Sequence, residues 1–215
     1  MTVVAVSTHL DDAVLSCFSV LGRETTVVTV LAGVPPEGVL GDWDEETGAT
    51  SSHRRVLERR LEDAEALRGA ASAFVHLDFP DSQYWGHASI SPPALGALVE
   101  ALRPCLADAE AVFVPAGIHN SDHKLVRDAA LAVRPGATLY ADLPYALHPD
   151  LGGFALPPEV PAAGRRRRDV QLDPARLAAK IEACRLYGTQ LERLFETFGP
   201  LLEGDALGLE AFWER

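Results

Sequence analysis

The sequence predicts an α/β fold in which helices cover both faces of a parallel sheet. Short apolar runs rich in β-branched residues recur along the 215-residue chain and show little alternation, as strands buried on both faces do. Helical segments separate these runs, and this β-α-β-α order implies right-handed crossovers between parallel strands. A chain of this length fits one domain with a sizeable core, so residues 1–215 are predicted to form a single domain.

Five strands are predicted at the apolar runs Val3–Val6, Thr26–Leu31, Phe74–Leu77, Ala111–Val114 and Thr138–Tyr140. Helices are predicted at Ala13–Leu21, Ser51–Arg68, Pro93–Leu102 and Asp122–Val133, and a final one from about Pro174 to Phe195. The segments 34–50 and 144–174 are rich in proline and glycine and are predicted to be long loops. Because loops of this length are usually functional or disordered, both are candidate walls of a substrate site.

The overall charge argues against a nucleic-acid or membrane-surface partner. Acidic residues outnumber lysine and arginine by 31 to 19, which gives a formal net charge of −12 and a pI of about 4.9. A field of this sign repels phosphate backbones and anionic lipids. One basic run, Arg165–Arg168, is predicted to be a solvated or mobile loop, with a clamp for an anionic group as the alternative.

Cysteine usage and the N-terminal sequence favour a cytoplasmic protein. The three cysteines are widely spaced in apolar or helical segments, which predicts buried free thiols in a reducing compartment. The chain does not open on a basic segment followed by an apolar run, so no signal peptide is expected. No apolar stretch reaches the roughly 20 residues that a membrane span requires.

Three polar side chains come directly after the first predicted strand, in the motif His9-Leu10-Asp11-Asp12. Open α/β sheets bind their ligands outside the carboxyl ends of the strands. A turn from strand to helix lets His9 and Asp12 face one point above the strand, while Asp11 is free to act as a base. The motif predicts a metal site, and the alternative is that His9 and Asp12 only cap the helix.

A second polar cluster, His119-Asn120-Ser121-Asp122-His123, follows the fourth predicted strand at another junction of strand and helix. Two histidines and one carboxylate are an expected set of protein ligands for catalytic zinc, and they would also suit iron(II). The two clusters together therefore predict the metal centre of a hydrolase.

Both clusters match motifs of a known family. The segment from Ser7 to Ser16 is similar to the (P/A)HxDD motif of the PIG-L/LmbE-like zinc-dependent N-acetylglucosaminyl deacetylases, and the segment from Asp122 to Val126 resembles their HxDHxxV motif. Weaker similarity extends over nearly the whole chain, at residues 42–44, 59–64, 81–84 and 180–190. The resemblance implies a Rossmann-like three-layer sandwich around the parallel sheet.

The resemblance also implies roles for individual residues. His9, Asp12 and His123 would bind zinc, and Asp11 would be the general base. Asp122 would orient a metal ligand or the neighbouring histidine.

One position departs from the family pattern. A histidine commonly stands three positions before the second metal-binding histidine, but here that position is Asn120 and the histidine is His119. In the family a basic residue near the second metal-binding histidine often polarises the amide carbonyl. Either the loop has one additional residue and His119 takes this catalytic role, or Asn120 takes it as a contact to the substrate. His119 is the preferred assignment.

Three further residues are candidates for substrate contact. Arg59 matches a position that contacts substrate in the family. Tyr145 and Asp142 follow the last strand predicted above, at the same edge of the sheet. For these two the alternative is packing beneath the 144–174 loop.

The implied reaction is hydrolysis of an N-acetyl or other N-acyl group on an amino-sugar conjugate, such as a natural-product or thiol-cofactor intermediate. The expected cofactor is Zn²⁺, with Fe²⁺ or another divalent metal as alternatives, and the expected partner is a small-molecule amino sugar. The sequence leaves homo-oligomerisation open. Two other functions compete: a non-catalytic sugar-binding module on the same fold, and a metal-dependent phosphoesterase, since adjacent carboxylates also suit two-metal sites.

Overall fold

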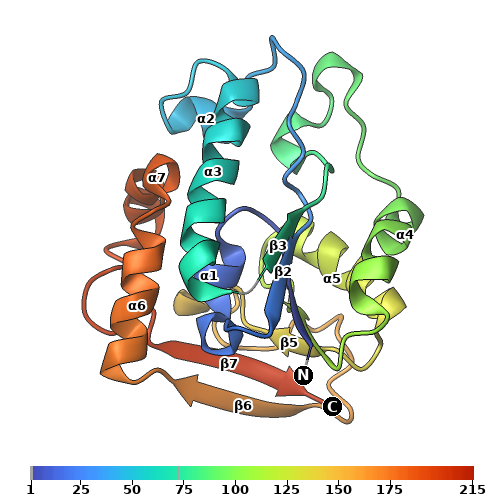
Figure 1. Ribbon diagram of the computed structural model, residues 1–215, viewed down its shortest axis with the longest axis vertical. Coiled ribbons are helices and arrows are strands. Elements are labelled where there is room, and N and C mark those ends of the chain that lie inside the picture. The colour runs from blue at the N-terminus through green and yellow to red at the C-terminus, as the bar shows by residue number, and fades with distance from the viewer. Residues whose placement is uncertain (1, 72) are drawn as a thin grey trace.

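A mixed sheet of seven strands forms the centre of the molecule in a computed structural model that describes residues 2–71 and 73–215 (Figure 1). The strand order is β3-β2-β1-β4-β5-β7-β6. Strands β1 to β5 pair in parallel, whereas β7 pairs antiparallel with both β5 and β6. The strands are Val3–Ser7 (β1), Thr25–Thr29 (β2), Ala73–His76 (β3), Ala111–Pro115 (β4), Thr138–Tyr140 (β5), Arg166–Gln171 (β6) and Leu209–Glu214 (β7).

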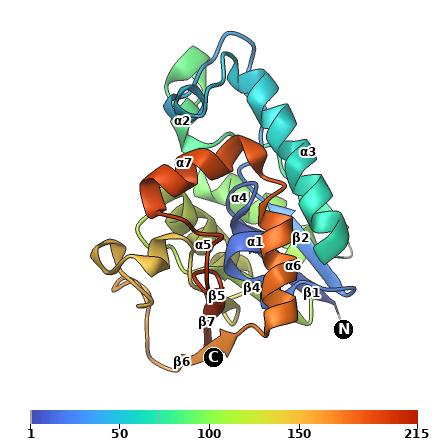
Figure 2. The same cartoon turned by 90° about the vertical axis from the view of Figure 1, so that its left-hand side faces the viewer.

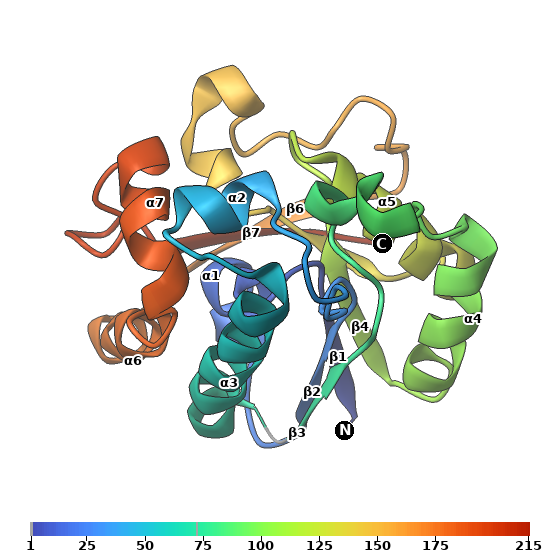
Figure 3. The same cartoon turned by 90° about the horizontal axis from the view of Figure 1, so that it is seen from above.

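Helices cover both faces of this sheet, which confirms the predicted α/β sandwich. The layer formed by α1, α3 and α6 lies on one face, and α4 and α5 lie on the other (Figure 3). The helices are Asp12–Ser16 (α1), Asp42–Glu46 (α2), Ser52–Ala70 (α3), Leu95–Leu106 (α4), Ser121–Val133 (α5), Pro174–Cys184 (α6) and Gly188–Phe198 (α7). Within the described ranges, no helix is long and apolar enough to cross a bilayer.

The strand order places a crevice between β1 and β4. From β1 the chain moves outward through β2 to β3, and then returns to add β4 and β5 on the other side of β1. Open α/β sheets bind ligands where the strand order reverses in this way, because the two following loops diverge. Both polar clusters of the sequence follow strands at this point, since His9 comes after β1 and His123 comes after β4.

Buried strands without alternation form the core, as predicted. In β1 the residues Val4, Ala5, Val6 and Ser7 are all buried, because helices cover both faces of that strand. Tyr140 of β5 is fully buried and donates its hydroxyl proton to the Val6 carbonyl at 2.8 Å. The central strands are therefore tied together by side chains as well as by their backbone ladders.

Two predicted helices differ from the structure. The helix predicted over Ala13–Leu21 ends at Ser16 and is followed by a 3-10 turn over Phe18–Val20. The predicted final helix is interrupted after Cys184, and α7 begins only at Gly188. Tyr187 has non-helical dihedral angles there and donates its hydroxyl to Asp63 of α3 at 2.8 Å. This anchor lets α7 leave the direction of α6 and cross beside α2 (Figure 2).

The prediction of one loop over residues 144–174 is wrong, because the segment contains two 3-10 turns and strand β6. The basic run lies at the start of this edge strand. Arg165 donates to the carbonyls of Ala137 and Trp213, and Arg168 pairs with Glu214 at 2.5 Å. Charged side chains on an edge strand discourage pairing with another chain.

A buried ion pair ties β7 to the helical layer. Lys180 donates to Glu210 Oε1 at 2.8 Å and to the Leu207 carbonyl at 2.9 Å, and both charged residues are fully buried. Glu210 also accepts the backbone N–H groups of Phe18 and Ser19 at 2.8 and 2.9 Å. The carboxylate therefore joins α6, β7 and the turn after α1.

Removing one partner of this pair should destabilise the fold strongly. Glu210→Ala leaves the Lys180 ammonium buried without its counter-charge, and we expect a loss of about 3–5 kcal/mol in the free energy of unfolding. Urea denaturation measures this value. The matched control is Glu196→Ala, which breaks an exposed pair with Arg193 and should cost less than about 1 kcal/mol. Equal losses in the two variants would contradict the assigned role.

Candidate active site

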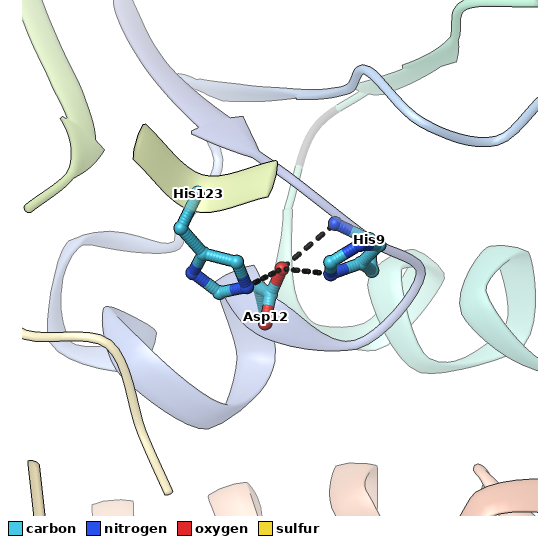
Figure 4. Close-up of side chains that lie close together, drawn as sticks. All are labelled: His9, Asp12 and His123. Carbon is cyan, nitrogen blue, oxygen red and sulfur yellow. Dashed lines mark hydrogen bonds and ion pairs between the residues drawn. The ribbon is translucent and has the colours of Figure 1, made fainter. Parts of the chain in front are cut away.

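One carboxylate oxygen faces both candidate histidine ligands (Figure 4). Asp12 Oδ2 lies 3.4 Å from His9 Nδ1 and 3.4 Å from His123 Nε2. Two ligand atoms bound at the usual zinc distances around a tetrahedral ion are about 3.4 Å apart, so the observed spacing fits a metal ion. His123 is buried and does not line the adjoining pocket, whereas His9 and Asp12 do. The structure thus brings together the three predicted metal ligands.

Two further carboxylates orient the histidine rings. His123 Nδ1 lies 2.7 Å from Asp142 Oδ1, and His9 Nε2 lies 3.2 Å from Asp122 Oδ2. When each of these nitrogens donates its proton to the carboxylate, the other nitrogen of each ring presents a lone pair toward Asp12. Carboxylates commonly hold metal-binding histidines in this way.

The electrostatics of the site favour positive charge between the rings. Burial acts to lower the pKa of His9, but its hydrogen bonds with Asp12 and Asp122 raise that pKa well above its ordinary value. Burial likewise opposes protonation of His123, yet the charges of Asp12 and Asp142 raise its pKa. A divalent cation would neutralise the same excess of negative charge, which is a second reason why these residues fit a metal.

The turn after β1 positions the first cluster. Ser7 Oγ donates to the His9 carbonyl at 2.8 Å and accepts the Ala13 N–H at 3.0 Å, which ties the end of the strand to the start of α1. The His9 N–H donates to Asp12 Oδ2 at 2.7 Å. Between them Asp11 has φ of 156°, which side-chain-bearing residues rarely adopt and which marks a tightly constrained site.

Asp11 lines the pocket next to the candidate metal ligands. Burial and the charge of Asp12 raise the pKa of Asp11 to about 8, while the charges of His9 and Arg59 act in the opposite direction. A carboxylate whose affinity for protons is raised in this way suits proton transfer near neutral pH.

The second cluster places Asn120, and not His119, at the pocket. Asn120 caps α5 by accepting the Asp122 N–H at 2.8 Å, and its amide donates to the Tyr145 hydroxyl at 3.0 Å. His119 has φ of 62° and is exposed, and its ring centroid lies 5.7 Å from that of Tyr145, outside the pocket lining. The structure thus places His119, the preferred candidate for assisting catalysis, outside the pocket lining.

Tyr145 lines the pocket beside the metal centre, with its ring edge-on to His123 at 5.6 Å between centroids. Burial raises the pKa of Tyr145 to about 12, so the hydroxyl stays protonated at neutral pH. Because Asn120 donates to its oxygen, the phenolic proton is available to a group in the pocket.

Asp142 differs from its predicted role as a substrate contact. It is fully buried and does not line the pocket. One of its oxygens holds His123, and the other accepts the Ile118 N–H at 2.7 Å. Since both oxygens are used inside the protein, Asp142 positions His123 and is not presented to a substrate.

Arg59 of α3 brings a buried charge to the pocket lining. It projects from α3, is 7% exposed, and pairs with Asp44 Oδ1 at 3.2 Å. Tyr84 donates to the other oxygen of Asp44 at 2.6 Å. Arg59 Nε is buried without a hydrogen-bond partner in the described structure, and the residue itself lines the pocket.

Several residues of the pocket were not among the predicted site residues. The pocket has a volume of about 240 Å³ and extends from the candidate metal ligands to α2, α3 and α7. Asp81 contributes a carboxylate oxygen 3.9 Å from His9 Nε2, so that His9, Asp81 and Asp122 form a second group able to hold a cation. Asp44 and Asp81 lie in segments of weak family similarity, which was the one signal for them in the sequence.

Comparison with solved structures identifies deacetylases of closely similar fold. The zinc-inhibited form of teicoplanin deacetylase Orf2 has a TM-score of 0.79 and 26% sequence identity, and the match covers 99% of this chain and 97% of that one. The A40926 pseudoaglycone deacetylase Dbv21 has a TM-score of 0.72 and 28% identity, with 99% and 96% of the two chains covered.

One further solved structure shares the fold only, and the comparisons with family models and curated sequences found no match. The 4-carboxy-2-hydroxymuconate hydratase GalB of Pseudomonas putida KT2440 has a TM-score of 0.51 and 19% identity, with 99% and 95% coverage, and shows that the fold also carries other chemistry. No protein-family model and no curated protein sequence matches the chain.

The contact between Asp142 and His123 should govern metal affinity. Asp142→Asn keeps the size of the side chain but removes the charge that orients the ring, and we expect metal binding to weaken about 10- to 100-fold. Competition with a fluorescent zinc chelator measures the dissociation constant. Asp150→Asn, which changes an exposed carboxylate, is the control and should bind metal as the wild type does. Wild-type affinity in both variants would refute the positioning role.

Proposed function

We propose that the protein is a zinc-dependent deacetylase of the PIG-L/LmbE-like family, which hydrolyses the N-acetyl group of an amino sugar on a natural-product conjugate. The observation that carries the proposal is the spacing of His9, Asp12 and His123 around one point, with Asp11 in the adjoining pocket. The similarity to deacetylases of teicoplanin and of the A40926 pseudoaglycone supports both the reaction and the class of substrate.

His9, Asp12 and His123 would hold the metal. Two imidazoles and one carboxylate suit Zn²⁺ and also Fe²⁺, and three protein ligands leave a further position for chemistry. When bound, the ion supplies Lewis-acid activation of a water molecule and of the amide carbonyl.

Asp11 would move the protons of the reaction. It accepts a proton from the attacking water, whose oxygen forms a new bond to the acetyl carbon. Asp11 then passes that proton to the sugar nitrogen as the carbon–nitrogen bond breaks, which releases acetate and a free amine. One carboxylate thus serves as base and then as acid.

Tyr145 would stabilise the charge that develops on the amide oxygen. Its phenol is protonated, its oxygen is held by Asn120, and its proton is free to donate. A preorganised donor of this kind typically contributes about 3–4 kcal/mol to transition-state stabilisation.

Arg59 would bind the sugar. Its ion pair with the buried Asp44 holds the guanidinium at the lining of the pocket, where it would donate to a sugar hydroxyl oxygen. A buried donor that is satisfied only by the substrate discriminates strongly against ligands without the matching acceptor.

The proposal is tested by incubating the zinc-loaded protein with N-acetylglucosamine conjugates and measuring free amine and metal content together. We expect one zinc per chain and release of one amine and one acetate per turnover. Asp11→Asn is the matched control: it should retain the metal but lose at least about 100-fold in kcat, because the proton acceptor is removed. Phosphate release with two metals per chain, or no zinc binding at all, would overturn the proposal.

Two neighbouring substitutions distinguish the residues of the second cluster. Asn120→Ala removes the donor that positions the Tyr145 hydroxyl, and we expect kcat to fall by about 10-fold or more for the loss of this neutral hydrogen bond. His119→Ala alters an exposed ring outside the pocket and should change kcat less than about twofold. The two variants are compared under the same zinc loading. A larger loss in His119→Ala would restore the assignment of His119 as the assisting residue.

A further inference from the structure

We propose that the α7 side of the pocket is a subsite for an apolar group of the substrate, with Trp43, Leu194 and Phe198 as its specificity-determining residues. The group is a long acyl chain on the amide or an alkyl or aryl substituent on the sugar. This inference rests on the proposed deacetylase function and extends it from the reaction to the substrate.

The first support is the spacing along α7. Gln190, Leu194 and Phe198 are four residues apart, and all three line the pocket. Residues at this spacing form one ridge on a helix. The exposed Glu192 and Glu196 do not line the pocket, so α7 faces it with uncharged side chains, of which Leu194 and Phe198 are apolar. Figure 2 shows α7 crossing over the layer of α1 and α6, beside α2.

The second support is the continuity of this surface with the metal centre. The Phe198 ring contacts the Tyr145 ring edge-on at 5.4 Å, and Tyr145 in turn meets His123 edge-on at 5.6 Å. Two ring contacts therefore connect the α7 ridge to a metal ligand. A substrate whose amide lies at the metal centre would extend its next substituent along this apolar wall.

The third support is that the polar atoms next to the apolar side chains of this wall bond to one another. Trp43 donates its indole N–H to Gln190 Oε1 at 2.6 Å, and the Gln190 amide donates to Thr189 Oγ1 at 2.8 Å. Trp43 thus presents mainly its ring to the pocket, while the Tyr145 hydroxyl keeps its proton for the reacting amide. A polar side chain for the sugar, Arg59, also lines the pocket. A pocket with polar and apolar lining fits a ligand with one polar and one apolar part.

The test uses three substrates that differ only in where an apolar chain is attached. They are methyl N-acetylglucosaminide, octyl N-acetylglucosaminide and methyl N-octanoylglucosaminide, all below their micellar concentrations. We expect one octyl-bearing substrate to exceed the methyl N-acetyl compound at least about tenfold in kcat/KM, since apolar contacts in a pocket discriminate by about that factor. Preference for the octyl glycoside assigns the subsite to the sugar substituent, and preference for the octanoyl amide assigns it to the acyl chain. Equal values for all three would overturn the subsite.

Substitutions on α7 test whether this substrate preference depends on Leu194 and Phe198. Leu194→Gln and Phe198→Ser should each lower the ratio of kcat/KM between the preferred and the methyl N-acetyl substrate by about tenfold. The control is Glu192→Ala on the same helix, which should leave the ratio unchanged. Thermal melting identifies any variant that fails to fold. An unchanged ratio in both folded ridge variants would contradict the inference.

Equilibrium binding keeps the test independent of turnover. If no substrate releases an amine, the proposed function fails, but calorimetry still measures the affinities of the three compounds. Tighter binding of an octyl-bearing compound that is lost in Phe198→Ser supports the subsite. Equal affinities of the three compounds for the wild type would refute it.

Discussion

The architecture of the site depends on one carboxylate oxygen, Asp12 Oδ2, that faces His9 and His123 at 3.4 Å each. The two histidines follow different strands, β1 and β4, which are neighbours only because the strand order reverses between them. A cation held by all three residues would therefore join the two halves of the sheet. The geometry of this centre is a property of the topology as much as of the motifs that supply the side chains.

The balance of charge around His9 and His123 indicates that this group of side chains suits a cation. Asp122 and Asp142 each face one ring nitrogen, so three carboxylates surround two imidazoles in a largely buried space. Buried charges of one sign are costly unless opposite charge compensates them. The raised pKa values of both histidines are the response of the protein alone, and a divalent ion provides the same compensation without protonating its own ligands.

Local sequence patterns predict the parallel strands, and the general rule that ligands bind outside the carboxyl ends of such strands predicts that His9, Asp12 and His123 lie at one edge of the sheet. The role of Asp142 could not be predicted in this way, since its contact with His123 depends on how two distant segments pack. The orientation of His119 depends on a single positive φ, which no motif spacing encodes. The β6 strand was missed because a run of arginines has none of the composition of a buried strand.

The pocket combines two parts with different structural origins. The side with the candidate metal ligands is built by short turns after β1 and β4, and hydrogen bonds constrain His9, Asp12 and His123 there. The other side is built by α2 and α7, which are bonded to α3 and to each other: Thr189 bonds to Glu62, Tyr187 donates to Asp63, and Trp43 donates to Gln190. Substitutions along α7 can therefore change the shape and polarity of the pocket without moving a metal ligand. Under the proposed function, the fold separates the residues that would carry the reaction from those of the proposed apolar subsite.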